Sequence, residues 1–495
     1  MANNLYQKTI KLIWYLMLFI LPVTSMPLVA KILKSDTVAV PSILFLFILT
    51  LFWLLPYLHN SGTLSKLNLP LIIFVISAFV STLCAIFIEI PTFKTFSFFL
   101  NNLQSLITLA IGFCFFIVAS TLPHNEKVLR NSLRVINWSG LIMLVWAGIQ
   151  IFSWAAYHKY FEWMFNFQGL FSSRVLYHNR ATGFALEPSW FSHQLNMLYL
   201  PLWLAASIRR YSSHTMRFFG FSFENCLLIA GITGLFFTFS RGGFLAFLSM
   251  LTLISIFINI RVIKKIRSAW MKKVNARQNR LQSVSKLITA ILAFLLIIAY
   301  LSLILLGAYV LSRIDPRMKN LFEFKTDKEN PLLTYFNNLQ FGERAVYWLS
   351  GWEIFGDHPI LGVGLGNAGF FFPSKITPYG WTLIEIRRLM YEYDVLLNIK
   401  SLWVRILAET GLVGFSIFLS WLILLLSAFV RVLRDEKGIN AALGLAGIFV
   451  IVALPAEGFS IDSFALPYLW ISMGLAVSAT RLSTESEYIS SLGNA

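Results

Sequence analysis

The sequence predicts an all-α membrane protein of about twelve transmembrane helices, with a long extracytoplasmic loop between spans 9 and 10. Hydrophobic residues make up 57% of the 495 positions and charged residues only 13%, about half the charged share of a soluble protein. Apolar runs of about 20 residues, long enough to cross a bilayer, recur along the chain. The net charge of +17 gathers in the short segments on one side of these runs, as the positive-inside rule expects.

Twelve apolar runs are candidates for membrane spans. The first lacks a small-residue cleavage site, so we expect an anchor rather than a signal peptide. With the N-terminus inside, an even number of spans leaves both termini in the cytoplasm. The expected spans are 10–32, 38–58, 69–89, 99–121, 135–157, 186–208, 222–239, 242–260, 287–311, 406–430, 439–455 and 462–480.

The chain is expected to divide into four parts. Residues 1–311 hold spans 1–9 and a basic cytoplasmic loop at 261–286, which carries nine basic residues and no acidic one. Such a loop suits anionic lipid headgroups; a nucleic-acid arm is the less favoured interpretation. Residues 312–405 form the periplasmic loop, whose length indicates a functional role. Residues 406–480 hold spans 10–12, and 481–495 form a cytoplasmic tail.

The middle of the long loop, "GERAVYWLSGWEIFGDHP", predicts an interfacial helix. Arg344, Trp348 and Trp352 recur at i, i+4 and i+8 and therefore share one helical face. Aromatic rings on such a face suit the level of the lipid headgroups. The same rings suit sugar faces, so Trp348 and Trp352 are candidate sugar-binding residues, with a role as interface anchors as the alternative.

The stretch "GVGLGNAG", residues 362–369, matches a dinucleotide-binding glycine pattern on paper. That pattern works only after a strand and before a helix in a parallel sheet. Here it follows Pro359, which ends the predicted helix. We expect the glycines to form a tight turn that re-enters the membrane surface, where protein or a water-filled cavity must cover the irregular backbone.

Ionisable residues at membrane depth are costly and are therefore functional candidates. In "NRATGFALEPSWFSHQL", Glu187 precedes Pro188 at the start of span 6. It is either a helix-start carboxylate or a carboxylate that faces a polar cavity beside Arg180. In "FTFSRGGF", Arg241 lies between spans 7 and 8. The following helix start would complete an anion site with it; contact with lipid headgroups is the alternative.

Two further places carry charge near the outer face. Arg344 opens the aromatic helix, and an ordinary surface charge beside Glu343 is the alternative. In "SLWVRILAETGLVGF", Ser401, Arg405 and Glu409 share one helical face, either as a functional set or as a self-satisfied pair. Arginine suits a diphosphate because its planar fork donates two parallel hydrogen bonds.

These motifs have a familiar order. "RATGFALEPSW", "FTFSRGGF", "GERAVYWLSGWEIFGDHPILGVGLGNAGF" and "LAETGLVGFSIFL" together resemble the O-antigen ligase and polymerase (Wzy-type) family of bacterial polysaccharide assembly, over roughly 179–430. The resemblance implies a GT-C-like membrane glycosyltransferase in the bacterial inner (cytoplasmic) membrane. Its substrates would be undecaprenyl diphosphate-linked glycans at the outer leaflet. The family's diphosphate-binding arginines correspond by motif to Arg241 and Arg344; Arg180 is a further candidate from its position.

Within this family, the sequence favours a polymerase, which transfers the glycan to a lipid-linked repeat unit. Ligases carry a His-Asn pair before the Glu-x-Gly segment, and here that region, "NIKSLWVRILAETG", has no histidine. A ligase that attaches glycan to lipid A-core is the alternative, and a lipid-linked glycan transporter is the third. Glu187 and Glu409 are the candidate proton acceptors, with Arg405 as a further catalytic candidate.

We expect the site to use neither a metal ion nor a cofactor. None of the outer histidines stands in a metal-ligand pair, and no outer Asp-x-Asp or Glu-x-His pair is present. The expected partners are the donor and acceptor glycolipids, membrane lipids, a flippase and a chain-length regulator. No nucleic-acid partner is expected.

Overall fold

The computed structural model describes residues 2–33, 40–273 and 341–493, with single positions between 291 and 313. The regular elements of this described part are helices, apart from one short β-hairpin. The chain divides into two compact units. The first comprises Met1–Phe247, Tyr347–Thr377 and Arg388–Ala495, and the second comprises Leu248–Val346 and Pro378–Arg387.

The elements before residue 241 are α1 (Ala2–Phe19), α2 (Pro27–Leu33), α3 (Ser42–Leu49), η1 (Thr50–Leu54), α4 (Leu55–His59), η2 (Lys66–Asn68), α5 (Leu69–Cys84), η3 (Ala85–Phe87), α6 (Phe98–Thr121), α7 (Glu126–Tyr157), α8 (Glu162–Phe171), α9 (Pro188–Gln194), η4 (Leu195–Tyr199), α10 (Leu200–Arg209), β1 (Arg217–Phe218), β2 (Phe221–Ser222) and α11 (Phe223–Phe237). The later elements are α12 (Arg241–Lys273), α16 (Gly342–Asp357), α17 (Ala368–Lys375), η5 (Gly380–Thr382), α18 (Ile384–Tyr391), α19 (Leu402–Asp435), α20 (Gly438–Glu457) and α21 (Pro467–Gly493).

Short polar residues mark the starts of several long helices. At these positions a side-chain oxygen accepts a hydrogen bond from an amide of the first turn, which has no partner within the helix. The capping residues are Ser97 of α6, Asn125 of α7, Ser222 of α11 and Ser401 of α19. The apolar runs therefore begin as helices where the sequence supplies a cap.

The predicted all-α membrane class is confirmed. Seven of the described helices are long and apolar enough to cross a membrane. Every predicted span in the described part of the chain coincides with a helix or with consecutive helices. The ninth predicted span, 287–311, lies largely outside the described residues. The chain is thus a multi-pass membrane protein.

The first predicted span, 10–32, is not one continuous helix. α1 ends at Phe19 and α2 begins at Pro27. Pro22 and Pro27 explain the break, because proline has no amide hydrogen and restricts the residue before it to extended conformations. Apolar composition alone therefore overestimated the length of this helix.

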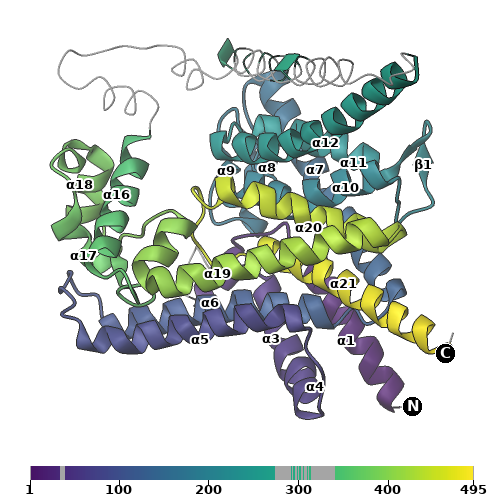
Figure 1. The fold of residues 1–495 in the computed structure, drawn as a ribbon. Coiled ribbons are helices and arrows are strands. Elements are labelled where there is room, and N and C mark those ends of the chain that lie inside the picture. The colour runs from purple at the N-terminus through teal and green to yellow at the C-terminus, as the bar shows by residue number, and fades with distance from the viewer. Residues whose placement is uncertain are drawn as a thin grey trace. The chain divides into compact units, whose positions relative to one another are not determined.

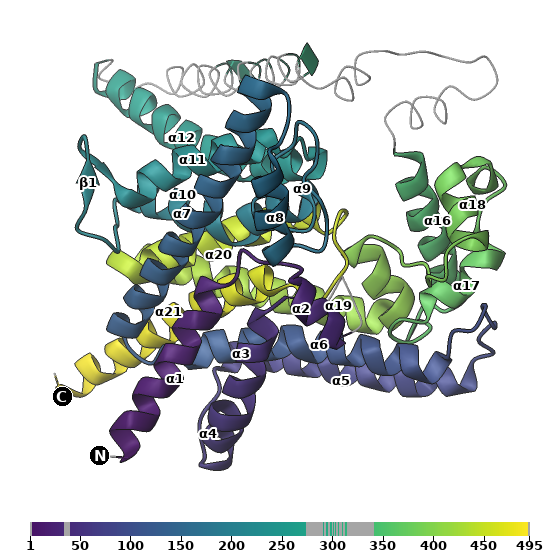
Figure 2. The same ribbon diagram turned by 180° about the vertical axis from the view of Figure 1, so that it is seen from behind.

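The core of the first unit is built around α20. This helix is largely buried inside protein, whereas the longer spans expose half or more of their apolar windows. It packs against α10, α19 and α21, while α21 packs on α6 and α19 on α5. Figure 1 shows α19, α20 and α21 running alongside one another next to α5 and α6, and Figure 2 shows the same layer from behind. Residues at the ends of α20 therefore touch several helices at once.

Two helices with candidate residues are irregular. Gly411 has φ +64° and ψ −168°, so α19 is two helical segments joined by a kink. Between α9 and α10 the chain forms the π-helical turn η4. Pro201 removes the amide that would bond the Met197 carbonyl, and the Ser472 hydroxyl donates to that oxygen at 2.5 Å instead. Such π-turns often occur at functional sites.

The predicted helix in the long loop is present as α16 (Gly342–Asp357). Tyr347, Ser350 and Ile354 form its buried face, and Trp352 is exposed. This arrangement fits the predicted amphipathic pattern. Its place at the membrane surface, the periplasmic side of the loop and the four-part division of the chain stay predictions.

Candidate functional site

The first turns of α19 carry Arg405 and Glu409 as a buried ion pair. Arg405 Nε donates to Glu409 Oε2 at 2.9 Å, and the side chains are 12% and 5% exposed. Arg405 Nη1 also donates to the backbone carbonyl of Asp462 at 2.8 Å. The two residues share one helical face, as their spacing predicts. Removing one partner would leave a buried charge, at a cost of about 3–5 kcal/mol.

The glycine-rich segment 362–369 docks on the kink of α19. The kink at Gly411 interrupts the helical hydrogen bonds and frees carbonyl oxygens before it. The amide of Gly364 donates to the Glu409 carbonyl at 3.0 Å, and the amide of Val363 donates to the Ala408 carbonyl. Protein thus covers the irregular backbone, as the predicted re-entry into the membrane surface would require. The segment follows α16 rather than a strand, so the context for dinucleotide binding is missing.

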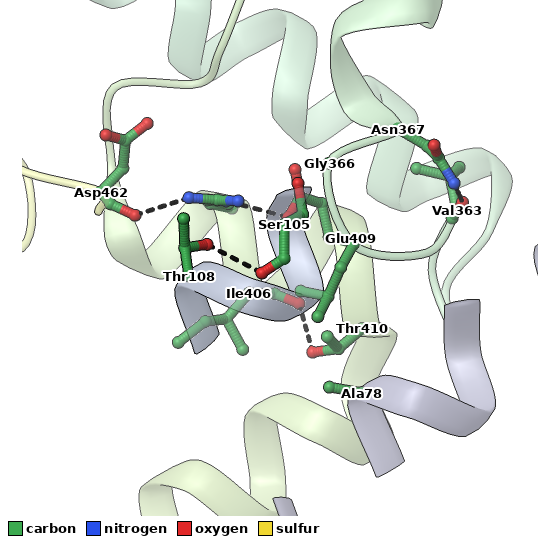
Figure 3. A network of polar contacts seen from close by, with 12 residues as sticks. Ala78, Ser105, Thr108, Val363, Gly366, Asn367, Ile406, Glu409, Thr410 and Asp462 are labelled. Atoms are coloured by element: carbon green, nitrogen blue, oxygen red, sulfur yellow. Dashed lines mark hydrogen bonds and ion pairs between the residues drawn. The ribbon is translucent and has the colours of Figure 1, made fainter. Parts of the chain in front are cut away.

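The same segment encloses the Glu409 carboxylate. The Gly366 amide donates to it, and Asn101 of α6 donates to the Gly366 carbonyl at 2.6 Å. Figure 3 shows Glu409 near Gly366, with Ser105 of α6 and Asp462 in the same network. Glu409 therefore holds Arg405 and the glycine segment together.

Glu187 occupies the N-cap position of α9, with Pro188 as the first helical residue. This agrees with the helix-start interpretation. Its carboxylate forms an ion pair with Arg174, a residue that the sequence analysis did not single out. The Ser189 hydroxyl donates to it at 3.3 Å. With side chains 54% and 32% exposed, such a pair contributes about 0–1 kcal/mol to stability, and Glu187 stays accessible.

Arg180 lies against the hairpin between α11 and α12. Its Nε donates to the Thr238 carbonyl at 2.8 Å, and the Ala181 amide donates to the Phe237 carbonyl at 2.8 Å. Thr238 precedes Arg241 by three positions. The structure therefore brings the segment of Arg180 to the turn that carries Arg241.

Arg180 also lines a small cavity with Gln150, Trp154 and Tyr160. Burial raises the pKa of Tyr160 to about 12, so this phenol is neutral at physiological pH. Its hydroxyl donates to the Tyr177 carbonyl at 2.7 Å. Among the described residues that line this cavity, Arg180 is the one charged side chain.

Arg241 is the first residue of α12. The preceding Ser240 hydroxyl accepts a hydrogen bond from the Gly243 amide at 3.4 Å, as a helix cap does. A guanidinium at a helix start, where amides point outward and the dipole is positive, favours an anion. The anion site at this hairpin stays a prediction.

A buried polar cluster that no sequence pattern predicted lies beside this helix start. Glu457, at the end of α20, accepts hydrogen bonds from Asn196 Nδ2 at 2.7 Å and His193 Nδ1 at 3.0 Å. Asn196 Nδ2 also donates to the Gly243 carbonyl at 2.9 Å. The available signal was Glu457 itself, an ionisable residue two positions after the end of span 439–455.

The α20–α21 loop, residues 458–466, connects the candidate groups of the first unit. Its Gly458 carbonyl accepts a hydrogen bond from the Leu402 amide at 2.6 Å, at the start of α19. The Asp462 carboxylate accepts one from the Lys400 amide at 3.1 Å. In the sequence this loop is only a short connection between two spans, so nothing in it predicted these contacts.

The two tryptophans lie on α16 at the predicted spacing. The Trp348 ring packs against Phe459 of the α20–α21 loop, with centroids 5.0 Å apart. Trp352 is 56% exposed, and its ring packs at a tilt against Phe355, with centroids 5.4 Å apart. Arg344 lies in the first turn of α16 and belongs to the second unit. The roles assigned to these three residues stay predictions.

Comparison with known proteins tests the family resemblance found in the sequence. No curated protein matches the chain significantly. An O-antigen ligase family model matches residues 226–419, which include Arg241, α16, the glycine segment and Arg405 with Glu409. Residues 226–419 are therefore similar to the O-antigen ligase family, which supports the resemblance found in the sequence.

Proposed function

We propose that the protein is a polysaccharide polymerase of the bacterial inner membrane. It would transfer glycan from undecaprenyl diphosphate to a lipid-linked repeat-unit acceptor at the outer leaflet, with both termini of the chain in the cytoplasm. The family match supports an enzyme of the O-antigen ligase and polymerase class acting on lipid-linked glycans. Polymer formation, metal independence and the flippase and chain-length partners belong to this proposal.

One observation carries the proposal beyond the family. Three arginine-bearing segments of the first unit are tied together by hydrogen bonds. Arg180 donates to the turn that precedes Arg241. In the first turn of α12, the Gly243 carbonyl accepts from Asn196, which also donates to Glu457. The loop that follows Glu457 accepts from Arg405. Guanidinium groups carried by segments linked in this way would suit the two phosphates of a lipid diphosphate.

The chemistry follows from these charges. An acceptor sugar hydroxyl attacks the anomeric carbon, a new C–O bond forms, and the bond to the diphosphate breaks with its electron pair leaving on the diphosphate. Arg241 and Arg180 of the first unit would stabilise the charge that develops there. The diphosphate role of Arg344 stays a prediction from the family resemblance. Glu187 is the accessible candidate to take the hydroxyl proton. Glu409, enclosed by Arg405 and Gly366, would fix the Arg405 guanidinium in position.

Ligation to lipid A-core is the second candidate function, because the matching family model describes O-antigen ligase. The absence of a histidine before "SLWVRILAETG" favours the polymerase, and so does the "TGFALEPSW" stretch, which resembles polysaccharide polymerases. A lipid-linked glycan transporter is the third candidate, and it would move its substrate without changing glycan length.

Deletion of the gene distinguishes these functions. We expect gel analysis of the surface polysaccharide to show loss of long chains, with one repeat unit retained, and complementation by the intact gene to restore them. Loss of every repeat, with lipid-linked polymer accumulating, would indicate the ligase instead. Accumulation of single lipid-linked repeats on the cytoplasmic leaflet would indicate a transporter.

A further inference from the structure

A buried network surrounds the start of α12 and lies mostly outside the family match at 226–419. Glu457 is 2% exposed, His193 6% and Asn196 0%. They come from three elements, α20, α9 and η4, that are separate in sequence and meet at one point. A buried carboxylate is costly unless donors satisfy it, and here two donors do so.

The geometry makes Glu457 the centre of this network. Its Oε1 accepts from Asn196 at 2.7 Å and its Oε2 from His193 at 3.0 Å. The same Asn196 nitrogen donates to the Gly243 carbonyl at 2.9 Å. Glu457 thereby orients Asn196, and Asn196 holds the first turn of α12, which Arg241 opens.

The first turn of α12 packs closely against the residues around this network. A Cβ atom at Gly243 would overlap the Ser192 hydroxyl, which lies next to His193 in the sequence. A Cβ atom at Gly242 would overlap the Ser460 hydroxyl of the α20–α21 loop. Only residues without a side chain allow α12 to begin this close to α9 and to the loop.

We propose that Glu457 is a positioning residue that, through Asn196, fixes the first turn of α12 and so sets Arg241 for the diphosphate of the lipid-linked substrate. His193 is the second donor that keeps the Glu457 carboxylate in place. The proposal rests on the proposed function, because it takes the diphosphate contact of Arg241 from it. Glu457 acts on the ligand only through Arg241.

The test measures ligand binding rather than polymer formation. The purified full chain in lipid nanodiscs is titrated with undecaprenyl diphosphate, and the Kd is compared among Glu457→Met, Arg241→Ala and the double variant. Met keeps the length of Glu but cannot accept these hydrogen bonds. We expect Glu457→Met to weaken binding about tenfold in the wild-type background and less than twofold beside Arg241→Ala, since coupled residues are not additive.

Glu224→Met is the matched control. Glu224 is another carboxylate that is 3% exposed, and it accepts hydrogen bonds from Ser212, Ser213 and Asn137. It has no contact with the start of α12 among the described residues. We expect this variant to lose stability as Glu457→Met does but to keep the wild-type Kd. Equal loss of affinity in the two Met variants would refute positioning.

A second pair of variants tests the network at His193. Asn places an amide nitrogen near the position of the imidazole Nδ1, so His193→Asn should keep the bond to Glu457 and the wild-type Kd. His193→Phe removes the donor and should weaken binding. If His193→Asn binds as poorly as His193→Phe, the donor is not what matters and the proposal is wrong.

Two further outcomes separate this proposal from the proposed function. Equal effects of Glu457→Met with and without Arg241 would overturn the positioning role while the gene-deletion result stands. Wild-type protein that does not bind undecaprenyl diphosphate would overturn the role of Arg241 and the positioning proposal together. Retention of long chains after gene deletion would refute polymerisation whatever the binding data show.

Discussion

At the scale of single residues, arginine rather than charge alone defines the candidate site. We predict that Arg241→Lys and Arg344→Lys each lose a good part of the roughly 1.5–3 kcal/mol of a charged hydrogen bond, because lysine lacks the planar fork. Single-turnover transfer should slow about tenfold to a hundredfold, and the Ala variants should lose more.

The control for these variants is their amount in the membrane, which should equal that of the wild type. Arg388→Lys, a largely exposed residue paired with Glu392, serves as a matched variant that should transfer normally. Well-expressed Arg241→Ala and Arg344→Ala proteins that still make full-length polymer would contradict the diphosphate contact.

At the scale of elements, the glycine segment 362–369 and the kink of α19 form one unit of structure. Gly364 has φ +85°, and a Cβ atom there would lie 2.8 Å from the Cβ of Ala85. We predict that Gly364→Val destabilises the docked segment and lowers transfer activity, because β-branched residues avoid positive φ. Gly356→Val is the control, since nothing lies within 4 Å of a Cβ atom at that position.

The readouts are the thermal midpoint in detergent and the transfer rate. A lower midpoint and rate for Gly364→Val, with little change for Gly356→Val, would support the structural role. Specific NAD or ATP binding to the wild-type protein that Gly364→Val abolishes would instead restore the nucleotide interpretation.

The elements also show which features of the fold could be predicted from the sequence. Apolar length predicted the helices well, because membrane depth leaves few other backbone structures possible. Apolar length did not predict the helix break at Pro22 and Pro27, because it does not take into account the backbone restrictions that proline imposes. The glycine segment was predicted to need cover, but its partner carbonyls lie more than forty positions later, beyond any local pattern. Glu457 was missed because it follows an apolar run and resembles an ordinary loop carboxylate.

At the scale of the whole molecule, the decisive question is which side of the membrane the site faces. The basic residues of the short loops predict cytoplasmic termini, which would put the 158–185 segment, the turn before Arg241, the long loop and the α20–α21 loop on the same outer side. Their hydrogen bonds within the first unit agree with one shared face. An inverted chain would place the same groups in the cytoplasm, where no outer-leaflet substrate reaches them.

Cysteine labelling tests this orientation. In a background with Cys84, Cys114 and Cys226 replaced by Ala, Tyr391→Cys is placed on the expected outer side and Phe219→Cys on the expected cytoplasmic side; both positions are well exposed. An impermeant thiol reagent should label the first variant in intact spheroplasts and the second only after lysis. Both cysteines lie at well exposed positions of the same chain and meet the same reagent. A difference in their labelling therefore reports the side of the membrane on which each lies. The reverse pattern would move the arginines to the cytoplasmic face and remove the physical basis for transfer at the outer leaflet.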